Sequence, residues 1–148
     1  ESYDGTSWTE IANLNTARFA LTGAGIQTSG IVFGGYAGGA KSETESWNGT
    51  SWTEVANLNT VRDIAGGAGI SNSSALAFGG TDAPGQTVNT EQWDGSSWTE
   101  VANLATARGG LGGTGTVNLA LAFGGTPPVT TATEEWTQVH AIKTVALS

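Results

Sequence analysis

Three arginines and three glutamates recur at matching places along the chain, and their side chains are those best suited to bind or cleave a substrate. They are Arg18, Arg62, Arg108, Glu10, Glu54 and Glu100. A guanidinium binds a carboxylate through two parallel hydrogen bonds, and paired carboxylates at a suitable separation hydrolyse glycosidic bonds. Each set, however, occupies one place in a repeated phrase. We therefore expect the arginines to bond loop carbonyls or a nearby Glu, and the glutamates to be solvated or paired with the arginines.

Other reaction centres lack the residues they need. The chain has one histidine, His140, in an aberrant C-terminal segment, and it has no cysteine. A metal site built on paired histidines, a thiolate site and a cysteine nucleophile are therefore excluded. No nucleophile motif accompanies His140 for a Ser-His-Asp triad. We expect no catalytic residue, no metal and no cofactor, and therefore no enzymatic activity.

Charge is scarce and predominantly acidic. Charged residues make up 12% of the chain, the formal net charge is -8, and the five Lys and Arg residues are spread out. Nucleic acids and anionic membrane surfaces attract clustered Lys and Arg, so neither is an expected partner. No apolar run approaches the roughly 20 residues of a membrane span. The chain begins inside a repeat without a Met, so we expect a processed product, a fragment, or the ordered part of a longer protein.

One phrase occurs three times. It reads ESYDGTSWTEIANLNT at 1–16, ESWNGTSWTEVANLNT at 45–60 and EQWDGSSWTEVANLAT at 91–106. The copies begin 44 and 46 residues apart, and a second phrase ending in Phe-Gly-Gly follows each of them. A fourth copy begins at Glu134 but lacks its second Trp. A period of this length indicates a repeat architecture.

The middle repeat predicts four short strands, at 62–70, 74–79, 88–93 and 97–104. The second is a continuous apolar run bounded by Gly-Gly, which is typical of a strand buried on both faces. Asp94-Gly95 separates the last two, and Asp-Gly is a strong hairpin signal because both residues tolerate positive φ.

Two features of these strands need a structural explanation. The first strand is rich in Gly and Ala, which indicates that another backbone approaches closely, as expected for the innermost strand of a radial array. In the fourth strand, Trp98 and Val101 are three residues apart, which breaks the alternation of a strand. A bulge would explain that spacing.

These motifs resemble the Kelch repeat of β-propellers. The shared pattern is a hydrophobic residue before Gly-Gly, then an aromatic residue, then a Trp, then an Arg before the next blade. It is carried by Phe33, Gly34, Gly35, Trp47, Trp52 and Arg62, by Phe78, Gly79, Gly80, Trp93, Trp98 and Arg108, and by Phe123, Gly124 and Gly125. The resemblance implies an all-β fold of Kelch-like β-propeller blades, each of four antiparallel strands.

The repeats divide the chain into one Kelch-like domain over 1–148. We expect a leading outer hairpin at 1–17 and successive blades at 18–61, 62–107 and 108–148. Propellers have about four to eight blades, so three full repeats do not close a ring comfortably. Further repeats or other chains complete the ring, or the blades form an open stack with exposed edges. We favour the first two, and expect a homo-oligomer or a larger assembly.

Three stretches differ between the repeats although they join the same pair of strands. They are residues 36–44, 81–89 and 126–133. Binding usually occurs at variable loops on a repeated scaffold. The candidate binding residues are Tyr36, Lys41, Asp82, Gln86, Thr126 and Thr130.

The wording of the repeats, with WNGTSWTEV, a Gly/Ala segment and LAFGG, is also similar to Kelch-like repeats of tailed bacteriophages. Those repeats occur in virion structural or fibre-like proteins. This resemblance implies a non-enzymatic structural or adhesion module of a phage tail fibre or capsid, in the virion or outside the cell, that binds another virion protein or a host surface glycan or protein. A Kelch match alone does not define a function, so a cellular Kelch-type protein–protein interaction module is the alternative.

Overall fold

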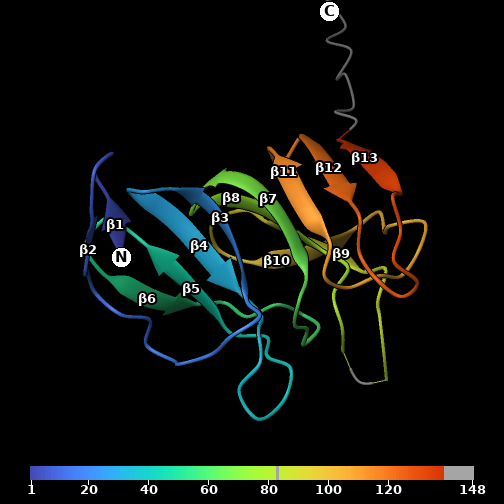
Figure 1. Ribbon diagram of the computed structural model, residues 1–148, viewed down its shortest axis with the longest axis horizontal. Helices are drawn as coiled ribbons and strands as arrows, with labels where there is room; N and C mark the ends of the chain where they lie inside the picture. The colour runs from blue at the N-terminus through green and yellow to red at the C-terminus, as the bar shows by residue number, and fades with distance from the viewer. Residues whose placement is uncertain (83, 139–148) are drawn as a thin grey trace, which may run out of the picture.

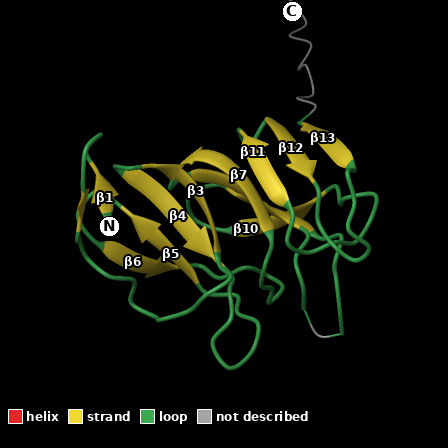
Figure 2. Ribbon diagram, in the orientation of Figure 1, coloured by secondary structure: helices red, strands yellow, loops and turns green. Residues whose placement is uncertain are grey.

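The computed structural model describes residues 1–82 and 84–138, and these residues form only β-strands and loops (Figure 2). Thirteen strands make four antiparallel sheets. Within the described residues there is no helix of the length and apolar character that a membrane span needs. The expected all-β, antiparallel fold class is therefore confirmed.

Each sheet keeps its strands in chain order. The N-terminal hairpin consists of β1 (Ser2–Tyr3) and β2 (Trp8–Thr9). The first sheet consists of β3 (Thr22–Ile26), β4 (Ser29–Phe33), β5 (Thr44–Trp47) and β6 (Trp52–Val55). The second sheet consists of β7 (Gly66–Ser71), β8 (Ser74–Phe78), β9 (Thr90–Trp93) and β10 (Trp98–Val101). The third sheet has β11 (Gly112–Gly115), β12 (Leu119–Phe123) and β13 (Thr133–Thr137).

The sheets lie side by side in chain order, with the hairpin at one end and the third sheet at the other (Figure 1). We call the face toward the following sheet the front face, and the face toward the preceding sheet the back face. The front face of the first sheet contributes Ile31 and Phe33 to a buried core, which the back face of the second sheet completes with Ala75, Ala77 and Trp93. Ile31 and Phe33 thus pack on the small side chains of Ala75 and Ala77, and the Trp93 indole completes the same core.

A second core repeats this pattern between the second and third sheets. Leu76 and Phe78 project from the front face of the second sheet, and Ala120 and Ala122 meet them from the back face of the third. Because β8 is buried on both faces, its continuous apolar run needs no alternation with polar residues.

Close contact between the first strands of successive sheets explains their glycines. β3, β7 and β11 lie side by side in Figure 1. A Cβ on Gly113 would lie 2.4 Å from the carbonyl oxygen of Gly67, and a Cβ on Gly67 would lie 2.7 Å from Thr22 Cγ2. The expected close approach of another backbone to this Gly-rich strand is therefore confirmed.

The hairpin between β9 and β10 turns at Asp94-Gly95, as the sequence predicts. Asp94 Oδ1 accepts hydrogen bonds from the backbone N–H groups of Ser96 and Ser97, each at 2.8 Å. Gly95 has a φ of 99°, in the region that favours glycine. These hydrogen bonds lower the pKa of Asp94 to about 2.

Several strand boundaries differ from those expected for the middle repeat. The Gly-rich strand begins at Gly66 because residues 62–65 cross from the first sheet to the second. The third strand begins at Thr90 instead of residue 88, and the fourth ends at Val101 instead of residue 104. The fourth is shorter because the chain after Val101 turns toward the third sheet, where the Ala105 N–H donates to a carboxylate.

The suggested bulge in β10 is absent, since its four residues pair with β9 in continuous register. Trp98 packs in the core between the first and second sheets, and Val101 packs against the core between the second and third. Their spacing of three therefore reflects contacts on opposite faces of the strand, one with each core. A register shift does occur elsewhere in the second sheet, between Gly69 and Ser71 of β7.

Candidate functional site

Arg62 is enclosed where the chain crosses from the first sheet to the second. Its Nη2 donates to Glu91 Oε1 at 2.6 Å, and both side chains are 0% exposed. Its Nη1 donates to the carbonyl oxygens of Gly79 at 3.1 Å and Asn89 at 2.7 Å. Burial lowers the pKa of Arg62, and the adjacent Glu91 carboxylate opposes that shift. The guanidinium therefore links the chain crossing to residues at the ends of β8 and β9. It is buried and cannot be reached by a substrate carboxylate.

Glu91 also holds the loop that leads into the crossing. Its Oε2 accepts hydrogen bonds from the backbone N–H of Asn59 at 2.7 Å and from Asn59 Nδ2 at 2.9 Å, and its Oε1 accepts from the N–H of Thr60 at 3.3 Å. The expected bonding of this arginine to loop carbonyls and a Glu is therefore confirmed, but sequence reasoning did not identify which Glu, nor the asparagine. The signal was present, because a Glu stands two residues before an aromatic residue in each copy, a Tyr in the first and a Trp in the others.

The other two arginines pair with the glutamates that are equivalent to Glu91 in the other copies of the repeat. Arg18 Nη2 lies 3.1 Å from Glu45 Oε1, and Arg108 Nη2 lies 3.0 Å from Glu134 Oε1. The third copy is more open, because the Glu134 side chain is 26% exposed. Ala105 also replaces the asparagine of the other copies, so only its backbone N–H reaches Glu134, at 2.6 Å. All three arginines therefore pair with a carboxylate of the repeat.

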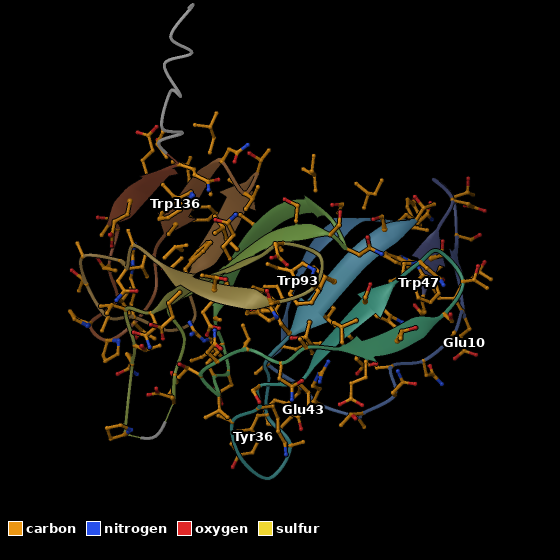
Figure 3. The ribbon with its side chains drawn as sticks, turned by 180° about the vertical axis from the view of Figure 1, so that it is seen from behind. Glu10, Tyr36, Glu43, Trp47, Trp93 and Trp136 are labelled. Carbon is orange, nitrogen blue, oxygen red and sulfur yellow. The ribbon has the colours of Figure 1, made fainter. Side chains whose placement is uncertain are left out.

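The glutamates that follow Trp-Thr are separate from these pairs. Glu10, Glu54 and Glu100 are all exposed to solvent, and Figure 3 shows Glu10 at the outer edge of the molecule. We expected these glutamates to be solvated or paired with the arginines. The structure shows that they are solvated and that the arginines pair with a different set of glutamates.

The variable stretches lie at the same end of their sheets, since they connect β4 to β5, β8 to β9 and β12 to β13. Figure 1 shows the first two of these loops projecting from the same side of the molecule. Residues where the chain crosses from one sheet to the next belong to the same surface. Isolated antiparallel β-bridges pair Phe19 with Tyr36, Asp63 with Thr81 and Gly109 with Thr126. We call this surface the loop face. It comprises residues 36–43, 79–82, 84–89 and 124–132, with Phe19, Asp63 and Gly109.

The six candidate binding residues are divided evenly among the three loops. The first loop carries Tyr36 and Lys41, the second Asp82 and Gln86, and the third Thr126 and Thr130. No hydrogen bond or ion pair found in residues 1–82 and 84–138 joins any two of these side chains. The structure places them on one face without converging them on one point.

An exposed aromatic pair stands on the loop face. The rings of Phe19 and Tyr36 are tilted, with centroids 5.3 Å apart, and the two residues are 66% and 38% exposed. Figure 3 shows Tyr36 at the loop end, away from Trp47 and Trp93. Sequence reasoning missed Phe19, although the residue after each repeat arginine differs between copies. Exposed aromatic side chains are common anchors of binding surfaces.

Three hollows of the described structure lie away from the loop face. One lies between the second and third sheets, one along β3, β7 and β11, and one on the front face of the third sheet. The loop face is thus a projecting surface, suited to a partner that makes contact across several loops.

No group of three acidic or histidine side chains within the described ranges is placed to hold a metal ion. His140 lies outside the described residues. No protein-family model matches the sequence, and no curated protein matches it. A function for this chain therefore has to be argued from its geometry.

Proposed function

We propose that this chain is a non-enzymatic binding module, built from Kelch-like propeller blades, that contacts its partner through the loop face. One observation carries the proposal. The charged residues that recur in every copy form internal ion pairs or are dispersed on the surface, whereas the three loops that join the second and third strands differ between copies and lie on one face. A scaffold that is constant and loops that vary are typical of a recognition protein.

The blade interpretation is supported by the packing. Two successive sheets have four antiparallel strands in chain order, and each sheet packs its large front residues on the small back residues of the next. The first strands carry the glycines needed for crowding near an axis. Three such sheets are fewer than the roughly four to eight of a propeller. We propose that association of chains, or further repeats of a longer protein, supplies the others.

We propose a phage virion as the biological context, because the sequence of the repeats is similar to that of Kelch-like proteins of tailed bacteriophages. In a virion the module would join another structural protein or a host surface glycan. The low content of charged residues, 12% of the chain, suits such neutral polar partners. The phage setting rests on the resemblance, whereas the loop-face role rests on the geometry.

The loop-face role is tested by binding measurements with a glycan array, host cells and candidate virion proteins. We expect Phe19→Ala and Tyr36→Ala to weaken binding about tenfold or more, as loss of an aromatic anchor does. Ile26→Ala is the matched control, because Ile26 is 60% exposed and lies at the far end of β3. Equal weakening by the control, or full binding by both aromatic variants, would overturn the loop-face role.

A further inference from the structure

A groove opens between the second and third sheets. Its lining includes Phe78, Thr90, Leu104, Ala122 and Trp136. The third sheet has three described strands where its neighbours have four. Glu134, Glu135 and Trp136 of β13, the last described strand of the third sheet, also line the groove.

The corresponding place between the first and second sheets is filled by an indole. Trp98, at the start of β10, is 5% exposed. Its ring meets Phe33 edge-on, with centroids 5.0 Å apart, and its Nε1 donates to Thr44 Oγ1 at 3.2 Å. Phe33 and Thr44 thus form a seat with an aromatic surface and a hydroxyl acceptor, which is what a buried indole needs.

The same seat exists in the groove but holds no indole from the described residues of this chain. Phe78 ends β8 as Phe33 ends β4, and Thr90 begins β9 as Thr44 begins β5. Both line the groove. Leu104 is only partly buried, whereas its counterpart Leu58 is 4% exposed. The residues around the groove are therefore less well covered than the equivalent residues between the first and second sheets.

Trp8 is the matching side chain. It stands in GTSWTE, the phrase that carries the other outer Trp residues. It is 66% exposed and is paired with Tyr3 at 5.2 Å, close to the 5.4 Å that separates Trp93 from Trp98. Trp8 and Tyr3 thus form an exposed aromatic pair on a short hairpin, and exposed aromatic side chains are common anchors of binding surfaces.

We propose that this groove is a receptor for the Trp8 indole of a second copy of the chain. Trp8 and the groove lie at opposite ends of the molecule, as the places of β2 and β13 in Figure 1 show, so the contact joins two molecules. It is head-to-tail, and such a contact forms closed rings or open chains. This inference rests on the association of chains in the proposed function and names its surface. It does not depend on what the loop face binds.

Sedimentation velocity across a range of concentrations tests the contact. The wild type associates, whereas Trp8→Ala and Ala102→Arg each raise the dissociation constant about tenfold or more. Ala102 is exposed and lines the groove, so an Arg there blocks entry without entering a core. Ile70→Ala is the matched control, since Ile70 is an apolar residue that is 60% exposed and lies outside the groove; it leaves association unchanged.

Mixing the two variants gives the decisive result. Trp8→Ala keeps an open groove and Ala102→Arg keeps its indole, so the mixture forms a heterodimer at concentrations where each variant alone is monomeric. A monomeric wild type at all soluble concentrations, or a mixture that stays monomeric, would overturn the inference. Circular dichroism and thermal unfolding verify that both variants fold. Loop-face binding by the same variants is measured separately, so failure of the contact is distinguishable from failure of the proposed function.

Discussion

Arg62 donates a 2.6 Å hydrogen bond to Glu91, and neither side chain is exposed to solvent. The pair links a crossing of the chain to β9 of the second sheet. Glu91 shares its remaining acceptor capacity with Asn59 and Thr60 of the preceding loop. A single carboxylate thereby connects a crossing, a loop and a strand, which explains why the Arg and the Glu return in each copy.

Removing the guanidinium should be strongly destabilising. We expect Arg62→Met to lower the free energy of unfolding by about 3 to 5 kcal/mol, because it leaves a buried carboxylate without its counter-charge. Arg108→Met should cost less, since Glu134 is 26% exposed and water can solvate it. Urea unfolding monitored by tryptophan fluorescence measures both values. Glu100→Gln, at an exposed site, is the control, and equal losses for the two arginines would contradict this account.

The Asp94 turn should make stability depend on pH. The folded-state pKa of Asp94 is lowered from 3.8 to about 2 by hydrogen bonds from Ser97 and Ser96. A depressed carboxyl pKa gives stabilisation that is present above pH 3.8 and is lost as pH falls through about 2. Unfolding measured at a series of pH values should show this loss in the wild type.

Position 48 supplies a matched pair of variants for that test. Asn48 accepts the same two backbone hydrogen bonds, each at 2.9 Å, without a titratable group. We expect Asp94→Asn to fold normally and to lose part of the acid dependence, and Asn48→Asp to gain it in the same pH window. An NMR titration that gave Asp94 an ordinary pKa would contradict the prediction.

The sequence predicted the strands and the hairpin turns well because both follow from local chemistry. Asp94-Gly95 sets its own turn, and the apolar run of β8 requires burial on both faces. Contacts over long separations were harder to infer. Glu91 binds a loop that lies about thirty residues before it, and no local pattern of propensity reveals that partner.

The candidate site was predicted only in part, for a similar reason. Loops that vary between copies predicted candidate binding residues such as Tyr36, and the structure places these loops at the same end of their sheets. Phe19 was missed because its exposure depends on the crossing that pairs it with Tyr36. The alternation argument also failed at Trp98 and Val101, because the two side chains point to opposite faces of β10 and contact different cores, so no bulge is needed.

The contact between β7 and β11 should not tolerate a methyl group. A Cβ on Gly113 would lie 2.4 Å from Gly67 O and 2.5 Å from Phe78 Cζ. We expect Gly113→Ala to lower the free energy of unfolding by about 1 to 3 kcal/mol, which is typical of overpacking. Gly85→Ala is the control, since nothing lies within 4 Å of its Cβ position. Chemical denaturation of both variants gives the comparison, and an unchanged Gly113→Ala would show that the inner strands can separate.

The third copy of the repeat can be improved by restoring its asparagine. In the other copies Asn15 Nδ2 and Asn59 Nδ2 donate to a buried glutamate at 3.0 Å and 2.9 Å, whereas Ala105 offers only its backbone N–H to Glu134. Ala105→Asn adds that donor, and we expect it to raise the free energy of unfolding by about 0.5 kcal/mol, since Glu134 is partly solvated. Ala105→Asp places a like charge beside Glu134 and should lower it. Equal stability of the two variants at neutral pH would mean that the side chain at this position does not face the carboxylate, and the equivalence of the three copies would fail there.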